Sequence, residues 1–241
     1  MRATPPANPP VVRGPAGPAC REVARRLGLL GLHAACTRPS ELGAARAAPR
    51  PRALVLDADL PAAGLEEALE ALGPALEDGA TALAAGPAPP AARRARLRAA
   101  GVTLALFDPL DDATLRHQVN RTFLAARQGG RARRELRAPV PAAALLVDPT
   151  RGRRIPGTVY TLSEGGAFVE TAGRAPPGAT LELRIALGPS GLRLPATVVH
   201  AHPPGAGGPA PTGLGLRFAA IGTTTREIGA RVRARCEALA V

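Results

Sequence analysis

Arginine is the residue type in this sequence with the most specific binding chemistry. All 31 positions of the Lys and Arg class are Arg, and with 19 acidic residues they give a formal net charge of +12. The planar guanidinium donates two parallel hydrogen bonds, which suits phosphate groups and the edge of guanine. The charge therefore favours an anionic partner, and small anionic ligands belong to that class. GC-rich codons also enrich Arg, Ala, Gly and Pro together, so the charge alone identifies no partner.

Two carboxylates follow one short apolar run. Ala53-Leu54-Val55-Leu56 leads into Asp57 and Asp59. A continuous apolar run of this length is typical of a parallel strand that is buried on both faces. We expect both carboxylates to be solvated caps at the end of this strand.

The remaining polar groups indicate neither catalysis nor a metal site. His200 and His202 share one face of an expected strand, but no third ligand is adjacent, so we expect no metal. His33 and His117 are isolated. The Gly-Pro-Ser-Gly segment at 188–191 lacks the strand-turn-helix context of a nucleophile elbow. We therefore expect a protein that is not an enzyme and has no cofactor.

The first half of the sequence alternates between helical and extended patterns. Helices are predicted at 20–32, 65–76, 91–100 and 112–126, and strands at 53–56, 81–85 and 102–107, with residues 11–12 as part of a short first strand. This alternation predicts a doubly wound parallel α/β sheet with right-handed crossovers.

The second half has short strands separated by Gly and Pro turns. Strands are predicted at 142–147, 154–162, 167–171, 180–187, 192–201 and 213–218, followed by a helix at 227–240. Evenly spaced strands of this kind predict a six-stranded antiparallel β-barrel with a terminal helix. We place a Pro-rich tail at 1–10, the α/β domain at 11–127, a basic linker at 128–138 and the barrel with its helix at 139–241.

Residues 11–126 resemble bacterial response-regulator receiver domains. The Leu54-Val55-Leu56-Asp57 strand, with Pro61 four residues after Asp57, is similar to the strand that carries the phosphoacceptor in that family, and Phe107-Asp108-Pro109 stands where the family has Lys-Pro. The resemblance implies that Asp57 occupies the phosphoacceptor position.

The resemblance also implies partners that this sequence lacks. The family holds a divalent cation with two acids after the first strand, and it uses a hydroxyl residue and a Lys to neutralise the phosphoryl oxygens. Here residues 11–14 contain no carboxylate, Gly86 stands where the hydroxyl is expected, and Asp108 replaces the Lys. We expect Asp57 to be a vestigial, inactive position in a pseudo-receiver that serves dimerisation or docking.

Residues 131–241 resemble the PilZ domain, a bacterial receptor module for cyclic di-GMP. Its RxxxR signature is matched by Arg133 and Arg137, and Thr161-Leu162-Ser163-Glu164-Gly165-Gly166 matches its [DN]xSxxG signature except at the first position. The resemblance implies cyclic di-GMP as the ligand. The binding residues that it implies are Arg133, Arg134, Arg137, Thr161, Ser163, Gly165 and Gly166.

One departure leaves other functions open. Thr161 offers a hydroxyl where the family has the side-chain acceptor of Asp or Asn, and a lost hydrogen bond of this kind costs about 1–3 kcal/mol. The first alternative is a degenerate adaptor that binds only protein partners. The second is a nucleic-acid-binding protein that uses the arginine helix at 91–100, although scarce aromatic residues disfavour single-strand binding.

Cysteine usage and hydropathy favour the cytoplasm. The three cysteines, Cys20, Cys36 and Cys236, show no CxxC spacing and no disulfide framework. The N-terminal residues lack a signal-peptide core, and no run approaches the ~18–20 apolar residues of a membrane span. We expect a cytoplasmic bacterial signalling protein with an unknown protein partner or a homodimeric state.

Overall fold

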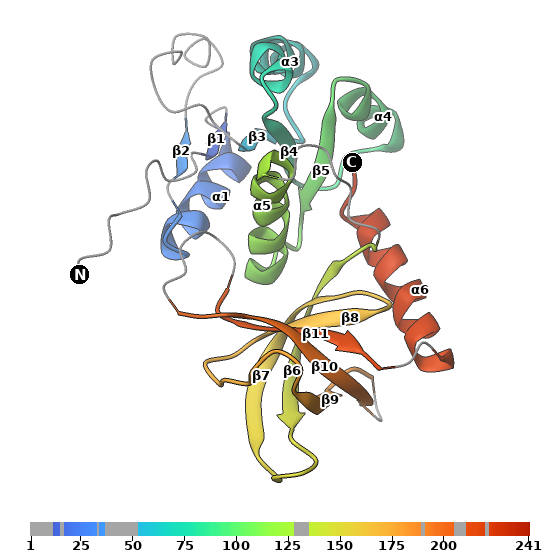
Figure 1. Cartoon of the computed structure of the whole chain (residues 1–241). Coiled ribbons are helices and arrows are strands. Elements are labelled where there is room, and N and C mark those ends of the chain that lie inside the picture. The colour runs from blue at the N-terminus through green and yellow to red at the C-terminus, as the bar shows by residue number, and fades with distance from the viewer. Residues whose placement is uncertain are drawn as a thin grey trace, which may run out of the picture. The chain divides into compact units, whose positions relative to one another are not determined.

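The computed structural model describes residues 12–14, 17–32, 34–36, 53–127, 135–188, 191–204, 211–219 and 222–241 (Figure 1). By its contacts the chain divides into two compact units, Met1–Ala132 with Ala238–Val241, and Arg133–Glu237. The expected Pro-rich tail and most of the expected basic linker lie outside the described residues. The sequence-based boundaries after residues 127 and 138 stay predictions.

The first unit contains a parallel sheet of five strands in the order β2-β1-β3-β4-β5. This is the order of flavodoxin-like doubly wound sheets, and it confirms the expected fold class. The strands are β1 (Val12–Gly14), β2 (Ala34–Cys36), β3 (Ala53–Asp57), β4 (Thr81–Gly86) and β5 (Val102–Phe107). The sequence did not predict β2, because Ala-Ala-Cys contains neither a β-branched nor an aromatic residue.

Helices cover both faces of this sheet. Successive residues of a strand point to opposite faces, so Leu54 and Val55 of β3 belong to different hydrophobic clusters. Val55 packs with residues of α1 (Pro18–Leu29) and α5 (Asp112–Arg127), whereas Leu54 packs with residues of α3 (Ala62–Glu77) and α4 (Ala91–Ala99). The core of this unit is therefore two layers of small and medium apolar side chains around a fully buried β3.

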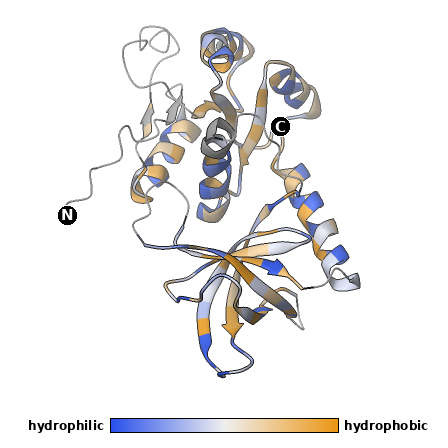
Figure 2. Cartoon of the chain, in the orientation of Figure 1, coloured by the Kyte–Doolittle hydropathy of each residue, from blue (hydrophilic) through white to orange (hydrophobic). Residues whose placement is uncertain are grey.

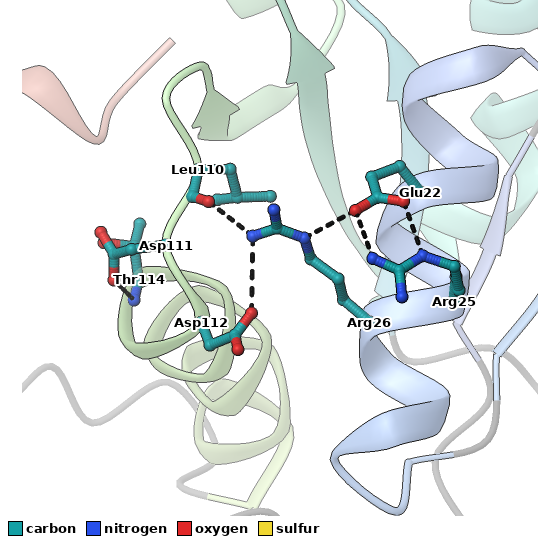
Figure 3. Close-up of polar contacts among 7 residues, drawn as sticks. All are labelled: Glu22, Arg25, Arg26, Leu110, Asp111, Asp112 and Thr114. Atoms are coloured by element: carbon teal, nitrogen blue, oxygen red, sulfur yellow. Dashed lines mark hydrogen bonds and ion pairs between the residues drawn. The ribbon is translucent and has the colours of Figure 1, made fainter.

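Polar contacts join α1 to the start of α5 (Figure 3). Arg26 donates from Nε to Glu22 Oε1 at 2.8 Å and from Nη1 to the carbonyl oxygen of Leu110 at 2.5 Å. The α5 terminus is capped by Asp111, whose Oδ1 accepts a hydrogen bond from the Thr114 amide at 2.7 Å. Such a cap satisfies an amide that has no partner within the helix.

The segment Ala238–Val241 belongs to the first unit. Ala240 forms an antiparallel bridge with Leu104 of β5, and the Ala105 amide donates to the Leu239 carbonyl oxygen at 3.0 Å. The side-chain Nε2 of buried Gln118 also donates to Leu239 O, at 2.7 Å, and Arg98 Nε donates to Val241 O at 2.8 Å. The terminal helix, expected to reach residue 240, thus ends at Ala238 because these residues pair with β5 instead.

The second unit is a closed barrel with the strand order β10-β11-β8-β7-β6-β9, and its neighbouring strands are antiparallel. This confirms the expected six-stranded barrel with a terminal helix. The elements are β6 (Ala138–Val147), β7 (Arg154–Leu162), β8 (Gly166–Glu170), β9 (Thr180–Ile185), β10 (Leu192–His202), β11 (Gly213–Phe218) and α6 (Thr223–Ala238).

Aliphatic residues fill the barrel. Leu146, Leu162 and Leu183 are fully buried, and Ile228 and Val232 of α6 belong to the same cluster. Figure 2 shows hydrophobic and hydrophilic residues alternating along α6, as an amphipathic helix requires. Within the described part of the chain, no helix combines the length and apolar character that a membrane span needs.

Candidate functional site

The antiparallel register of β6 and β7 brings the end of the first expected signature beside the second. Ala138 pairs with Leu162 and Pro139 pairs with Thr161. Residues just before β6 therefore lie beside residues just after β7. This register places Arg137, the last residue of the RxxxR pattern, next to the turn that contains Ser163.

We call Ser163, Gly165 and Gly166 the signature turn. The Ser163 amide donates to the Gly166 carbonyl oxygen at 2.8 Å, which closes the turn between β7 and β8. The Ser163 hydroxyl is 3.0 Å from the same oxygen and 3.1 Å from Glu135 Oε2. Ser163 is fully buried, so its hydroxyl is oriented by neighbours rather than by solvent.

The two glycines of the turn have different surroundings. A Cβ at Gly166 would lie 2.2 Å from the main-chain oxygen of Leu216 in β11, a distance that real side chains do not tolerate. Gly166 is therefore required for the close approach of β8 to β11. The atoms nearest to a Cβ at Gly165 would be those of the flexible Glu135 carboxylate, with Oε1 at 2.6 Å. The Gly165 carbonyl oxygen accepts a hydrogen bond from the Phe218 amide at 2.9 Å.

Thr161 stands in a different environment from the other expected site residues. It lies within β7, pairs with Phe168 of β8, and is 6% exposed. The structure therefore packs Thr161 into the barrel wall. The ligand contact expected of Thr161 stays a prediction.

Arginines approach the signature turn from two directions. Arg137 is half-buried, and its carbonyl oxygen accepts a hydrogen bond from Cys236 Sγ at 3.4 Å. Arg133 and Arg134 lie outside the described residues. Arg217, exposed on β11, is the register partner of Gly166. Arg217 is not among the binding residues expected from the sequence, because only strand pairing reveals its position beside the turn.

The two glutamates near the turn face different groups. Glu135 contacts Ser163 and Gly165, as given above. The Glu164 carboxylate lies beside Gly229 of α6 and 3.7 Å from Arg233. Glu135 is thus the carboxylate that lies on the turn itself, and sequence reasoning missed this contact because it depends on the register of β6 and β7.

Asp57 in the first unit is buried, so the expectation of a solvated cap was wrong for this residue. Its exposed fraction is zero, and its Oδ1 accepts a hydrogen bond from the Cys20 amide at 2.7 Å. A Cβ at Gly17 would lie 1.3 Å from Asp57 Oδ2, so the backbone before α1 covers the carboxylate. Asp57 is a cap for the N-terminus of α1, which favours negative charge. Asp59 is exposed, as expected.

The described residues around Asp57 also lack the groups that phosphoryl transfer needs. Burial raises the pKa of the Cys20 thiol, and the nearby Asp57 carboxylate raises it further. The Asp108 amide donates to the Gly86 carbonyl oxygen at 3.0 Å, and Gly86 has a φ of 104° with Ala19 Cβ close to the side-chain position. Neither position supplies the hydroxyl or the cation that phosphoryl transfer uses in receivers.

The two histidines of β10 have separate contacts. The His200 ring lies 5.9 Å from the Phe168 ring and packs on Gly215. His202 Nδ1 is 2.9 Å from the Pro211 carbonyl oxygen. Across the described ranges, no three His, Cys, Asp or Glu side chains gather in a way that holds a metal ion.

One family model and several solved structures are similar to parts of this chain. Residues 131–233 match the family model described as the PilZ domain. The PilZ domain of Escherichia coli YcgR, solved with c-di-GMP, is 20% identical, with coverage of 45% of this chain and 94% of that chain and a TM-score of 0.35. The inhibitor of motility MotI/DgrA of Bacillus subtilis is 16% identical, with coverage of 45% of this chain and a TM-score of 0.37, and the match spans 53% of that chain.

A different kind of protein matches as well. The chemotaxis protein CheY4 of Vibrio cholerae is 18% identical, with coverage of 48% of this chain and 99% of that chain and a TM-score of 0.41. A search of curated proteins found no match. With the closed barrel, the signature turn and the family match in one segment, residues 131–233 are a PilZ domain, and they follow a parallel α/β domain with the strand order of CheY-like receivers.

Proposed function

We propose that this protein is a non-enzymatic bacterial signalling protein whose PilZ domain binds cyclic di-GMP at the signature turn. The observation that carries the proposal is the register of β6 and β7, in which Ala138 pairs with Leu162. This register puts the end of the RxxxR pattern beside Ser163, Gly165 and Gly166. The end of one signature and the turn that carries the other, which are separate in sequence, thereby become neighbours.

The chemistry of this surface suits the ligand. Cyclic di-GMP presents two phosphodiesters and two guanines, and arginine donates in pairs to phosphate oxygens and to guanine O6 and N7. Arg137 is held at the turn by its position before β6, and Arg217 adds a cation from β11. We assign Arg133 and Arg134 to the same ligand by sequence alone, and we assign Thr161 to packing of the strand rather than to direct contact.

Relay of the signal belongs to the same proposal. Ligand binding changes an equilibrium only through contacts that differ between two states of the protein. We propose that contacts between the ligand and the arginines before β6 are that difference, and that they alter binding of a protein partner or self-association through the pseudo-receiver. The burial of Asp57 argues against phosphorylation of the pseudo-receiver, because the backbone at Gly17 covers its carboxylate.

Calorimetric titration of the full chain with cyclic di-GMP at physiological salt tests the proposal, with GTP as the control ligand. We expect saturable binding in the micromolar range or tighter, and a loss of at least about tenfold in Arg137→Ala, since a lost charged hydrogen bond costs about 1.5–3 kcal/mol. The matched control is Arg193→Ala, an exposed β10 residue with the same change in charge. The absence of both binding heat and thermal stabilisation up to high micromolar ligand would overturn the receptor function and favour the adaptor.

A further inference from the structure

We infer that the Glu135 carboxylate is a built-in competitor of the ligand at the signature turn. This inference rests on the proposed function, because it concerns regulation of the same site. An acidic side chain occupies the position that the anionic ligand needs, so the free protein holds its own site closed.

The contacts of Glu135 place both of its oxygens on the turn. Oε2 is 3.1 Å from the Ser163 hydroxyl, and a Cβ at Gly165 would lie 2.6 Å from Oε1 and 3.0 Å from Oε2. The space that Gly165 leaves open by having no side chain is therefore filled by a carboxylate. A ligand that approaches Gly165 and Ser163 meets this group first.

The hydroxyl of Ser163 cannot serve the ligand and Glu135 together. A serine hydroxyl has one proton to donate. Here Glu135 Oε2 and the Gly166 carbonyl oxygen already lie 3.1 and 3.0 Å from the Ser163 hydroxyl oxygen as acceptors. A phosphodiester oxygen needs the same proton. A phosphate beside an ionised carboxylate is also repelled by it, and proximity makes this repulsion stronger than among dispersed surface charges.

The position of Glu135 allows it to leave. Glu135 is an exposed residue that precedes β6, whose pairing with β7 begins at Ala138. The side chain therefore swings into water without loss of a strand hydrogen bond. Departure of Glu135 exposes the hydroxyl and the glycine surface, so competition and binding are two states of the same turn.

Glu135→Gln and Glu135→Ala separate the two parts of this competition. Gln removes the charge and keeps the shape, whereas Ala removes both. We expect both variants to bind cyclic di-GMP more tightly than the natural chain, by roughly 5- to 50-fold, with Ala at least as tight as Gln. Calorimetric titration of full-length proteins measures the change. Glu227→Gln is the matched control, because this exposed α6 residue makes the same change in charge, and we expect its affinity to stay within about twofold.

The outcomes distinguish this inference from the proposed function. Binding by the natural chain with equal or weaker binding by both Glu135 variants would overturn the competitor role and leave the receptor role intact. Binding by the variants alone would support both. No binding by any of the proteins would overturn the receptor role and the competitor role together. An equal gain in Glu227→Gln would attribute the effect to net charge and overturn the role of Glu135.

Discussion

At the scale of single residues, Gly165 and Gly166 show how two adjacent glycines serve different needs. Gly166 lies against the main chain of β11, so any side chain there must separate two paired strands. Gly165 lies against the end of the Glu135 side chain, which moves easily. The turn therefore combines one position that the fold requires with one position whose neighbouring side chain can move.

This difference predicts unequal costs for the same substitution. Gly166→Ala should lower the free energy of unfolding of the barrel by about 3 kcal/mol, because backbone cannot shift as a side chain does. Gly165→Ala should cost less than about 1 kcal/mol. Denaturant unfolding followed by circular dichroism measures both. Equal losses in the two variants would contradict the close approach of β8 and β11.

Asp57 is a second residue whose environment decides its role. We expect Asp57→Ala to destabilise the first unit by about 2 kcal/mol, because the Cys20 amide loses a charged partner at the start of α1. Asp59→Ala, at an exposed neighbour, should change stability by less than about 0.5 kcal/mol. Midpoints of urea unfolding give the comparison. If Asp57→Ala were as stable as the natural chain, this result would contradict the capping role.

At the scale of elements, the joint between α1 and α5 predicts a pH dependence. Hydrogen bonds from Arg25 and then Arg26 lower the pKa of Glu22 to about 2, below the ordinary glutamate value of about 4.3. A carboxylate with a lowered pKa in the folded state stabilises the fold above its unfolded pKa, and this contribution disappears as the pH falls towards the folded pKa. The contacts in Figure 3 should therefore weaken in acid.

Glu22→Gln tests this dependence. We expect the melting temperature of the first unit to fall less steeply between about pH 5 and pH 2 in this variant than in the natural chain. Glu67→Gln, at an exposed position of α3, is the control for general charge. Scanning calorimetry across this range measures the slopes, and parallel slopes for the two variants would argue against the ion pair.

Apart from β2, element types were predictable from the sequence, whereas several element ends were not. The strand β6 begins at Ala138, before its expected start at residue 142. The expected start was late because Pro139 and Pro141 disfavour an interior strand, but the structure tolerates both. The helix α6 begins at Thr223, four residues before its expected start. The expected start was late because β-branched residues have low helix propensity. Tertiary packing decided both ends.

The candidate site was predictable only where it is local in sequence. Ser163, Gly165 and Gly166 form the expected turn, since a hydroxyl and two glycines specify it within four residues. Glu135 and Arg217 approach the turn through strand register, which a single sequence does not reveal. The expected contacts of Arg133 and Arg134 lie outside the described residues and stay predictions.

At the scale of the whole molecule, the first unit depends on the segment Leu239–Val241. Deletion of these residues should lower the stability of the first unit by about 3 kcal/mol, because buried Leu239 and Val241 and two main-chain hydrogen bonds are lost. Hydrogen exchange should accelerate at the Ala105 amide, which donates to Leu239 O, and stay slow at Val159 inside the barrel. Unchanged exchange at Ala105 would contradict the pairing with β5.

The assignment of Ala238–Val241 to the first unit has a consequence for the order of folding during synthesis. Domains generally fold as the ribosome releases them, starting from the N-terminus. Here the PilZ barrel is one continuous stretch of sequence, so it can fold before the segment that pairs with β5 has been synthesised. The unit that is synthesised first is therefore the last to complete its fold. A nascent chain has a complete sheet edge only after residue 241 has emerged.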